Sequence, residues 1–177
     1  MVYQFKVVLA GQAAVGKTAL ADRFVYQKFQ EKYKLTIGVE MYTKKVDIKD
    51  ETAILTIWDI GGQSRFESIR ELFFNGADGA IFIYDATSSD SLFALHTWFK
   101  EYKRSNKMKY DISHNILVKN KIDLIKNVGE VISEKMINTI ARDPNGRIKE
   151  LYDVSAKKGT GVKKMFEGLT KLILDNR

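Results

Sequence analysis

Residues 11–18, with the sequence GQAAVGKT, have the types and spacing of a phosphate-binding loop, because Gly11 and Gly16 precede Lys17 and Thr18. Glycines let the backbone turn tightly, so that successive N–H groups converge on phosphate oxygens. The positive N-terminus of a following helix faces the same point. The lysine can reach the β- and γ-phosphates, and the threonine hydroxyl can bind Mg²⁺. We expect further backbone contacts from Ala13, Ala14, Val15 and Ala19.

A second group of polar residues follows an apolar run, in the sequence WDIGGQ at 58–63. Asp59 ends this run, and a carboxylate there suits the Mg²⁺ shell through a water molecule. Gly62 can turn its N–H toward the γ-phosphate, and Gln63 can orient an attacking water. Alone, these residues could equally be a solvated strand end and a surface loop. In a chain that also has a phosphate-binding loop, they predict a catalytic site, in which the catalytic residues are Gln63 and the loop residue Lys17.

Thr36 lies in the polar stretch 28–38 and supplies a third element. We expect its hydroxyl to complete the Mg²⁺ shell only while a γ-phosphate is present, so that the site reports whether the nucleotide is a triphosphate. A single threonine in a loop is weak evidence for a metal site. It becomes strong evidence only together with the other motifs. The predicted metal ligands are therefore Thr18, Thr36 and Asp59.

The sequence NKID, residues 120–123, points to the base. Asp123 offers two adjacent acceptors, which match the N1–H and 2-amino donors of guanine. Adenine has an acceptor at N1 and no 2-amino group, so it would leave the carboxylate unpaired, which is how a site rejects a competitor. Asn120 can contact the base and tie its loop to the phosphate loop, and the stem of Lys121 can lie along the base and sugar.

A further loop, SAK at 155–157, is expected to complete the guanine site. The N–H of Ala156 can meet the O6 acceptor of guanine, and Phe29 can stack on the base. The remaining predicted contacts come from Leu124, Ser155 and Lys157. Together with NKID, these residues predict a guanine nucleotide, GTP or GDP, rather than ATP.

The apolar pattern places these motifs at the ends of strands. Short β-rich runs alternate with helical segments, which predicts an α/β fold with a mostly parallel sheet and helices on both faces. A hairpin turning at 49–51 adds one antiparallel edge strand, giving six strands in all. The strands are expected at 3–10, 39–48, 52–58, 77–85, 114–120 and 148–155. Helices are expected at 17–27, between the third and fourth strands, after Ser88 or Ser89, from Ser133 and at 161–174.

Composition limits the class of protein. A chain of 177 residues with one proline and no linker composition predicts a single domain, 1–177. The absence of cysteine excludes disulfides and thiolate metal sites, and no apolar run approaches the roughly 18 residues of a membrane span, so we expect a cytoplasmic protein.

The positive charge is concentrated in residues 97–177, without a dense basic run interleaved with aromatics. A solvated lysine-rich face is therefore favoured over a nucleic-acid surface.

The five motifs, in this order and over essentially the whole chain, resemble a small GTPase of the Ras superfamily. The segments TIGVEM, IWDIGGQSRF and FFNGADGAIFIYDAT are similar to Rab signatures. The D-x-G-G-Q form and the two alanines of the phosphate loop are similar to Arf proteins. The resemblance implies a small G domain of the P-loop NTPase fold, which hydrolyses GTP to GDP and phosphate and acts as a molecular switch, in membrane trafficking or related signalling.

The resemblance also implies partners. Effector, activating and exchange proteins are expected to bind residues 29–40 and 60–75 of a monomer. The aromatic triad of Rab proteins would fall on Met41, Trp58 and Phe73, and is thus altered at its first member. The loops carry the apolar residues Ile37, Val39, Met41, Phe66, Ile69, Leu72, Phe73 and Phe74. Peripheral membrane association is expected, without an evident lipid anchor. Binding to nucleic acid is not expected.

The expected reaction is in-line attack of water on the γ-phosphate, catalysed by positioning and charge stabilisation. The stretch 28–38 contains Lys28, Lys32 and Lys34 but no arginine, so we expect slow hydrolysis without an activating protein. Two alternatives stay open on the sequence alone. One is a nucleotide-binding scaffold whose hydrolysis is impaired by Ala13. The other is an ATP-using P-loop enzyme, against which Asp123 argues.

Overall fold

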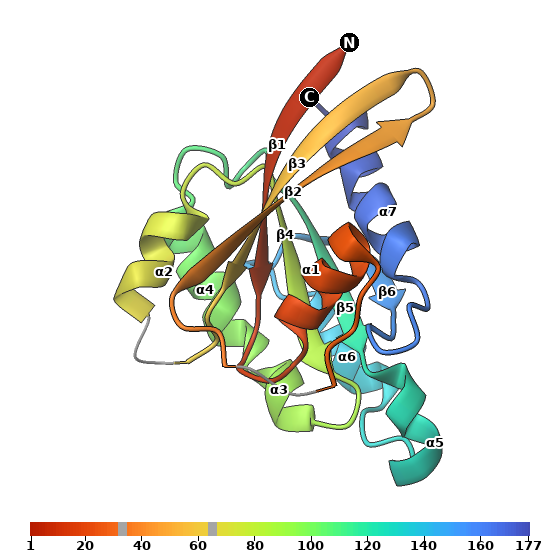
Figure 1. Cartoon of the computed structure of the whole chain (residues 1–177). Coiled ribbons are helices and arrows are strands. Elements are labelled where there is room, and N and C mark those ends of the chain that lie inside the picture. The colour runs from red at the N-terminus through yellow and green to blue at the C-terminus, as the bar shows by residue number, and fades with distance from the viewer. Residues whose placement is uncertain (32–34, 64–66) are drawn as a thin grey trace.

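The computed structural model describes residues 1–31, 35–63 and 67–177 (Figure 1). Within these residues six strands form one sheet in the order β2-β3-β1-β4-β5-β6. The strands are β1 (Val2–Ala10), β2 (Val39–Ile48), β3 (Glu51–Ile60), β4 (Gly79–Asp85), β5 (His114–Asn120) and β6 (Ile148–Asp153). All neighbours pair in parallel except β2, which runs antiparallel to β3 at one edge. The predicted sheet, with its antiparallel edge strand, is confirmed.

Helices cover both faces of this sheet (Figure 1). They are α1 (Lys17–Tyr26), α2 (Glu67–Phe74), α3 (Ser89–Phe93), α4 (Leu95–Ser105), α5 (Ile125–Val128), α6 (Glu134–Ala141) and α7 (Val162–Asp175), with a short 3₁₀ turn at Ile122–Leu124. Strand residues alternate between two cores, as a period of two requires. Val7 packs in the core of α1 and α7, whereas Val8 packs in the core of α2, α3, α4 and α6.

The observed helices differ from the predicted ones in detail. The hydroxyl of Ser88 accepts the N–H of Ser91 at 3.2 Å and caps α3. The single helix predicted there is divided into α3 and α4, which meet at Ala94, a residue that itself keeps the right-handed helical conformation. The 3₁₀ turn and α5, which together span residues 122–128, were not expected. They follow Lys121, whose backbone has a positive φ of 66°. The sequence does not indicate this conformation, because lysine rarely adopts it.

The two ends of the chain lie together, at the end of the sheet opposite the loops that follow β1, β4 and β5 (Figure 1). The guanidinium of Arg177 pairs with Glu51 and lies 4.1 Å from the ring centre of Tyr3. The N–H of Thr52 donates to the carbonyl of Met1 at 3.3 Å. Across the described residues, no helix has the length and apolarity needed to cross a bilayer.

Candidate functional site

A cavity of about 740 Å³ opens where the parallel strands end. This is the edge at which ligands of open α/β sheets bind. Most of the residues predicted to contact the nucleotide line this cavity. They are Ala13, Ala14, Gly16, Lys17, Thr18, Ala19, Phe29, Thr36, Gly62, Asn120, Lys121, Asp123, Leu124, Ala156 and Lys157. Of the other predicted residues, Gly11, Val15, Asp59, Gln63 and Ser155 do not line it.

The loop between β1 and α1 folds tightly around its lysine. Gly16 has a φ of 101°, and a Cβ there would lie 2.3 Å from Asn120 Nδ2, so only glycine fits. Lys17 Nζ donates to the carbonyls of Gly11 and Gln12, at 2.8 Å each. Burial lowers the pKa of Lys17 to about 8, although the charge of Asp59 opposes the shift. The ammonium is therefore held beneath the loop at a fixed place.

Three side-chain oxygens converge at the start of α1. Thr18 Oγ1 lies 2.8 Å from Thr36 Oγ1, and the Thr18 hydroxyl also donates to Asp59 Oδ2. Asp59 is fully buried, and burial raises the pKa of its carboxyl group while Lys17 opposes the shift. Among the described residues, Asp59 Oδ1 has no hydrogen-bond partner. Hard oxygen donors with one unpartnered buried carboxylate oxygen fit a divalent cation such as Mg²⁺.

The loop after β3 packs against the phosphate loop. The N–H of Gly61 donates to the carbonyl of Gly38 at 2.8 Å. A Cβ at Gly62 would lie 2.3 Å from the backbone N of Ala13, so the backbones of the two loops touch here. Gln63 is half-buried next to this contact, and its carbonyl accepts a hydrogen bond from Arg70 Nη1 at 2.8 Å. The loop that carries Gln63 is thus placed beside the phosphate loop.

Buried amide contacts join the loops expected to hold the base. Asn120 Nδ2 donates to the carbonyl of Val15 at 2.9 Å, and Asn120 Oδ1 accepts the N–H of Ala156 at 3.1 Å. The Ser155 hydroxyl donates to Asp123 Oδ1 at 2.6 Å. Asn120 therefore links the NKID loop to both the phosphate loop and the SAK loop, while Ser155 fixes the orientation of the Asp123 carboxylate.

The sequence analysis missed the cavity-lining residues Asp22, Gln30, Glu31, Leu35, Glu40 and Tyr42. It also missed two residues outside the lining that hold the loops in place. Arg23, on α1, donates to the carbonyls of Ala156 and Lys157 at 2.8 and 2.7 Å, so it holds the SAK loop against the helix. Asp85 pairs with Lys121, at 2.6 Å between Oδ2 and Nζ. Asp85 ends the buried strand β4, and its place at a strand end could have identified it. No sequence signal marks Arg23, because its partners are distant in the chain.

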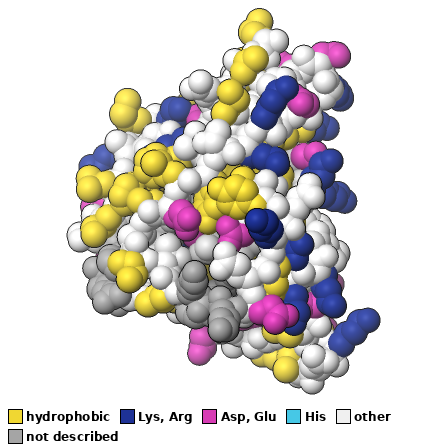
Figure 2. Space-filling model, in the orientation of Figure 1, with side chains coloured by type: hydrophobic (Ala, Val, Ile, Leu, Met, Phe, Trp, Pro, Cys, Tyr) yellow, Lys and Arg dark blue, Asp and Glu magenta, His cyan; other side chains and the backbone are white. Residues whose placement is uncertain are grey.

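The predicted partner surface lies along α2 and the edge formed by β2 and β3. Met41 pairs with Trp58 across the two strands, and the rings of Trp58 and Phe73 lie 5.5 Å apart. Figure 2 shows hydrophobic side chains gathered on this side of the molecule, on the left of the view. The exposed ones include Leu35, Ile37, Met41, Ile69 and Leu72. Leu35 was not among the residues we expected.

Other expectations for this surface have different outcomes. Phe74 is fully buried in the core, packed edge-on against Tyr102 with 5.5 Å between ring centres. It is therefore a core residue and not a contact residue. Val39 and Phe73 are half-buried. Three residues of the sequence analysis lie outside the described residues, namely Lys32, Lys34 and Phe66.

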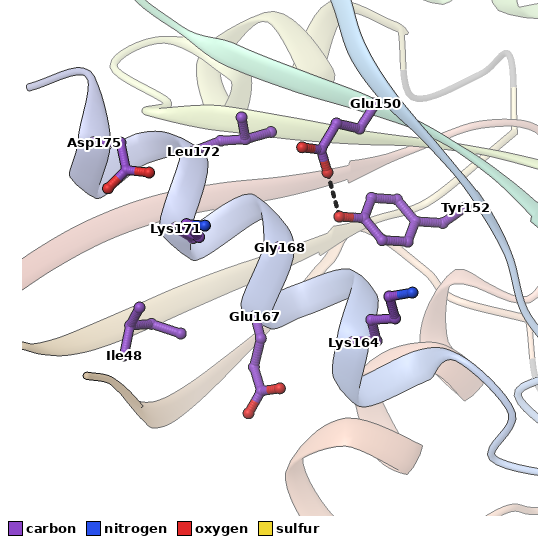
Figure 3. Close-up of a pocket in the computed structure, with 9 residues that line it drawn as sticks. All are labelled: Ile48, Glu150, Tyr152, Lys164, Glu167, Gly168, Lys171, Leu172 and Asp175. Carbon is purple, nitrogen blue, oxygen red and sulfur yellow. Dashed lines mark hydrogen bonds between the residues drawn. The ribbon is translucent and has the colours of Figure 1, made fainter.

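A second hollow, of about 410 Å³, lies between α7, β6 and the end of β2 (Figure 3). A hydrogen bond from the Tyr152 hydroxyl to Glu150 crosses one side of it. Its lining mixes two lysines with acidic side chains, and none of the predicted nucleotide residues reaches it. The features suited to a nucleotide are therefore concentrated in the larger cavity.

Comparisons with known proteins agree with this geometry. The family model described as "Ras family" matches residues 6–175. The chain is 36% identical to the Ras-related protein Rab7 of Cenchrus ciliaris over 172 residues, which cover 97% of this chain and 82% of the relative. It is 33% identical to the Ypt/Rab-type GTPase ypt71 of Schizosaccharomyces pombe over 171 residues, which cover 97% of this chain and 82% of that relative. The chain therefore belongs to the Ras family and is a Rab-like small GTPase, a GTP-hydrolysing switch.

Proposed function

We propose that the larger cavity binds GTP or GDP together with Mg²⁺, and that residues 1–177 form one G domain around it. The loop amides and Lys17 hold the phosphates, and the hydroxyls of Thr18 and Thr36 bind the metal, with Asp59 acting through water. The metal, when bound, neutralises charge that develops on the phosphate oxygens. The observation that carries the proposal is the convergence of these three side chains, together with the buried Asp59 Oδ1, which has no hydrogen-bond partner within residues 1–31, 35–63 and 67–177.

For the reaction, Gln63 orients the attacking water in line with the γ-phosphate, and Lys17 stabilises the charge of the transferred group. The position of Gln63 beside the contact between Gly62 and Ala13 supports this role, because that contact brings its loop to the phosphate end of the cavity. A buried lysine at a fixed place acts without reorganisation.

For the base, the Asp123 carboxylate accepts the N1–H and 2-amino groups of guanine, and Ala156 N–H meets its O6. Phe29 stacks on the ring, and the stem of Lys121 lies along the base and sugar. Support comes from the hydrogen bonds of Asn120 and Ser155, which hold these loops in one arrangement. Leu124 and Lys157 complete the lining.

The switch is read by partner proteins. Loss of the γ-phosphate releases Thr36 and Gly62, and with them the segments 29–40 and 60–75, to which effector, activating and exchange proteins bind. An apolar patch on a monomer is typical of such a surface. We propose that the chain acts as a cytoplasmic monomer that associates peripherally with membranes, in membrane trafficking or related signalling. No nucleic acid takes part.

Replacing Thr36 by alanine tests the switch. The hydroxyl contributes to the metal shell only in the triphosphate state, so the variant is expected to bind a non-hydrolysable GTP analogue about tenfold more weakly, a loss comparable with that of one hydrogen bond to a charged group. Its affinity for GDP should be unchanged. Both affinities are measured by displacement of a fluorescent guanine nucleotide in the presence of Mg²⁺.

Thr43→Ala is the matched control, because Thr43 is an exposed threonine of β2 away from the cavity. It should bind both nucleotides as the unchanged chain does. Equal weakening of GDP and of the triphosphate analogue by Thr36→Ala would contradict a role for Thr36 in sensing the γ-phosphate.

Hydrolysis by the chain alone is expected to be slow. No arginine lines the cavity among the described residues, and an arginine finger contributes about 10³- to 10⁵-fold in rate. A single-turnover assay with labelled GTP should therefore give a rate constant below about 10⁻² s⁻¹, the rate of proteins that carry their own finger. A faster rate from the purified chain would show that this interpretation of the site is wrong.

A further inference from the structure

A buried arginine on α2 reaches the loop of Gln63. Arg70 and Glu101, on α4, form an ion pair in which each side chain is 5% exposed. Arg70 Nε donates to Glu101 Oε2 at 2.9 Å, and Nη2 donates to Oε1 at 2.8 Å. The third nitrogen, Nη1, donates to the carbonyl of Gln63 at 2.8 Å. All three guanidinium nitrogens therefore have a partner.

An aromatic ring fixes the same guanidinium from one face. The Cζ of Arg70 lies 4.4 Å from the ring centre of Trp98, which is buried on α4. The Nζ of Lys17 lies 5.9 Å from that ring centre. Trp98 thus lies near both the arginine that reaches Gln63 and the lysine of the phosphate loop. Because the guanidinium is planar, two bonds to one carboxylate and one stacked ring leave it a single orientation.

Stability alone does not account for an ion pair in this place. The cost of removing two charges from water offsets most of their attraction, so that an apolar pair of similar volume is often as stable. Another arginine, Arg104 of α4, pairs with Glu71 of α2 at the exposed rim of the same two helices. That pair joins the helices without contacting Gln63. What Arg70 adds is a hydrogen bond at a fixed position on the backbone of the loop that carries Gln63.

We propose that Arg70 is a positioning residue for GTP hydrolysis, held in place by Glu101 and Trp98. It fixes the backbone of Gln63, so that the Gln63 side chain presents the attacking water correctly. The inference rests on the proposed role of Gln63. It makes α4, which contributes no residue to the nucleotide cavity, a support of the catalytic loop.

The test replaces the ion pair by an apolar pair, Arg70→Met with Glu101→Leu, which keeps the volume and leaves no charge unpaired. Single-turnover GTP hydrolysis is expected to fall about 10- to 100-fold, because small displacements of a catalytic group have effects of this size. GDP affinity and the thermal unfolding midpoint should stay close to those of the unchanged chain. Glu101→Gln is a milder second variant, which keeps one acceptor for Arg70 and should lower the rate in the same direction.

The same changes are made in a Gln63→Ala background, because residues that act through one another are not additive. Gln63→Ala should itself be slow, and adding the apolar pair should slow it no further. Arg104→Met is the matched control and should hydrolyse GTP at the unchanged rate. A normal rate for both the apolar pair and Glu101→Gln, or an additive loss in the Gln63→Ala background, would overturn the inference while leaving the role of Gln63 intact. A normal rate for Gln63→Ala would instead overturn that role, and the inference with it.

Discussion

Asp123→Asn is expected to change the base preference of the cavity from guanine to xanthine. Asparagine offers one acceptor and one donor side by side, which match the N1–H and the 2-carbonyl of xanthine but not the 2-amino group of guanine. A site built on hydrogen bonds rejects a mismatched partner by up to about 10⁴-fold. Displacement of a fluorescent nucleotide by GTP, XTP and ATP measures the three affinities.

The structure favours a clean result from this variant. The Ser155 hydroxyl that donates to Asp123 Oδ1 can also donate to an asparagine carbonyl, so the side chain should keep its orientation. Asp175→Asn is the control, because Asp175 is an exposed residue at the far end of α7. An Asp123→Asn variant that bound GTP with unchanged affinity would refute the assignment of the base site.

Lys17→Ala is expected to weaken the binding of GTP and GDP alike. Two hydrogen bonds from an ammonium group to phosphates contribute about 3–6 kcal/mol, which corresponds to about 10²- to 10⁴-fold in affinity. The change also removes the bonds to Gly11 and Gln12 that hold the loop closed. Dissociation constants for both nucleotides, with the thermal unfolding midpoint as a check on folding, measure the effect.

An exposed lysine provides the comparison for this variant. Lys126 lies on the surface of α5 and does not line the cavity, so Lys126→Ala should leave both affinities unchanged. If Lys17→Ala bound GTP tightly and lost only hydrolysis, the lysine would serve the reaction and not the binding of phosphates.

The parts of the site that the sequence predicts are those that local order dictates. A polar residue directly after a buried parallel strand must lie at the carboxyl edge of the sheet, beside the other strand ends. Asp59 and Asn120 occupy such positions, at the carboxyl ends of β3 and β5, and the pairing of Leu9 with Asp59 brings Asp59 next to the phosphate loop. The edge hairpin follows equally directly, since β2 and β3 are joined by a tight turn.

The remaining contacts depend on packing between distant segments. Arg70 and Glu101 lie on two helices and would each be taken for ordinary surface charges, yet they bury one another against Trp98. Arg23 meets the SAK loop only because α1 packs beside α7 in the folded chain. No periodicity or motif in the sequence predicts such pairs, because the two partners come together only when their helices pack in the folded chain.

The shared position of the two chain ends has a practical consequence. Both lie at the end of the sheet remote from the nucleotide cavity, where Arg177 contacts Glu51 and Tyr3 (Figure 1). A fluorescent reporter or an immobilising linker fused at either end would therefore leave the mouth of the cavity unobstructed. The chain can thus be attached to a sensor surface through either its N-terminus or its C-terminus, for measurements of nucleotide exchange.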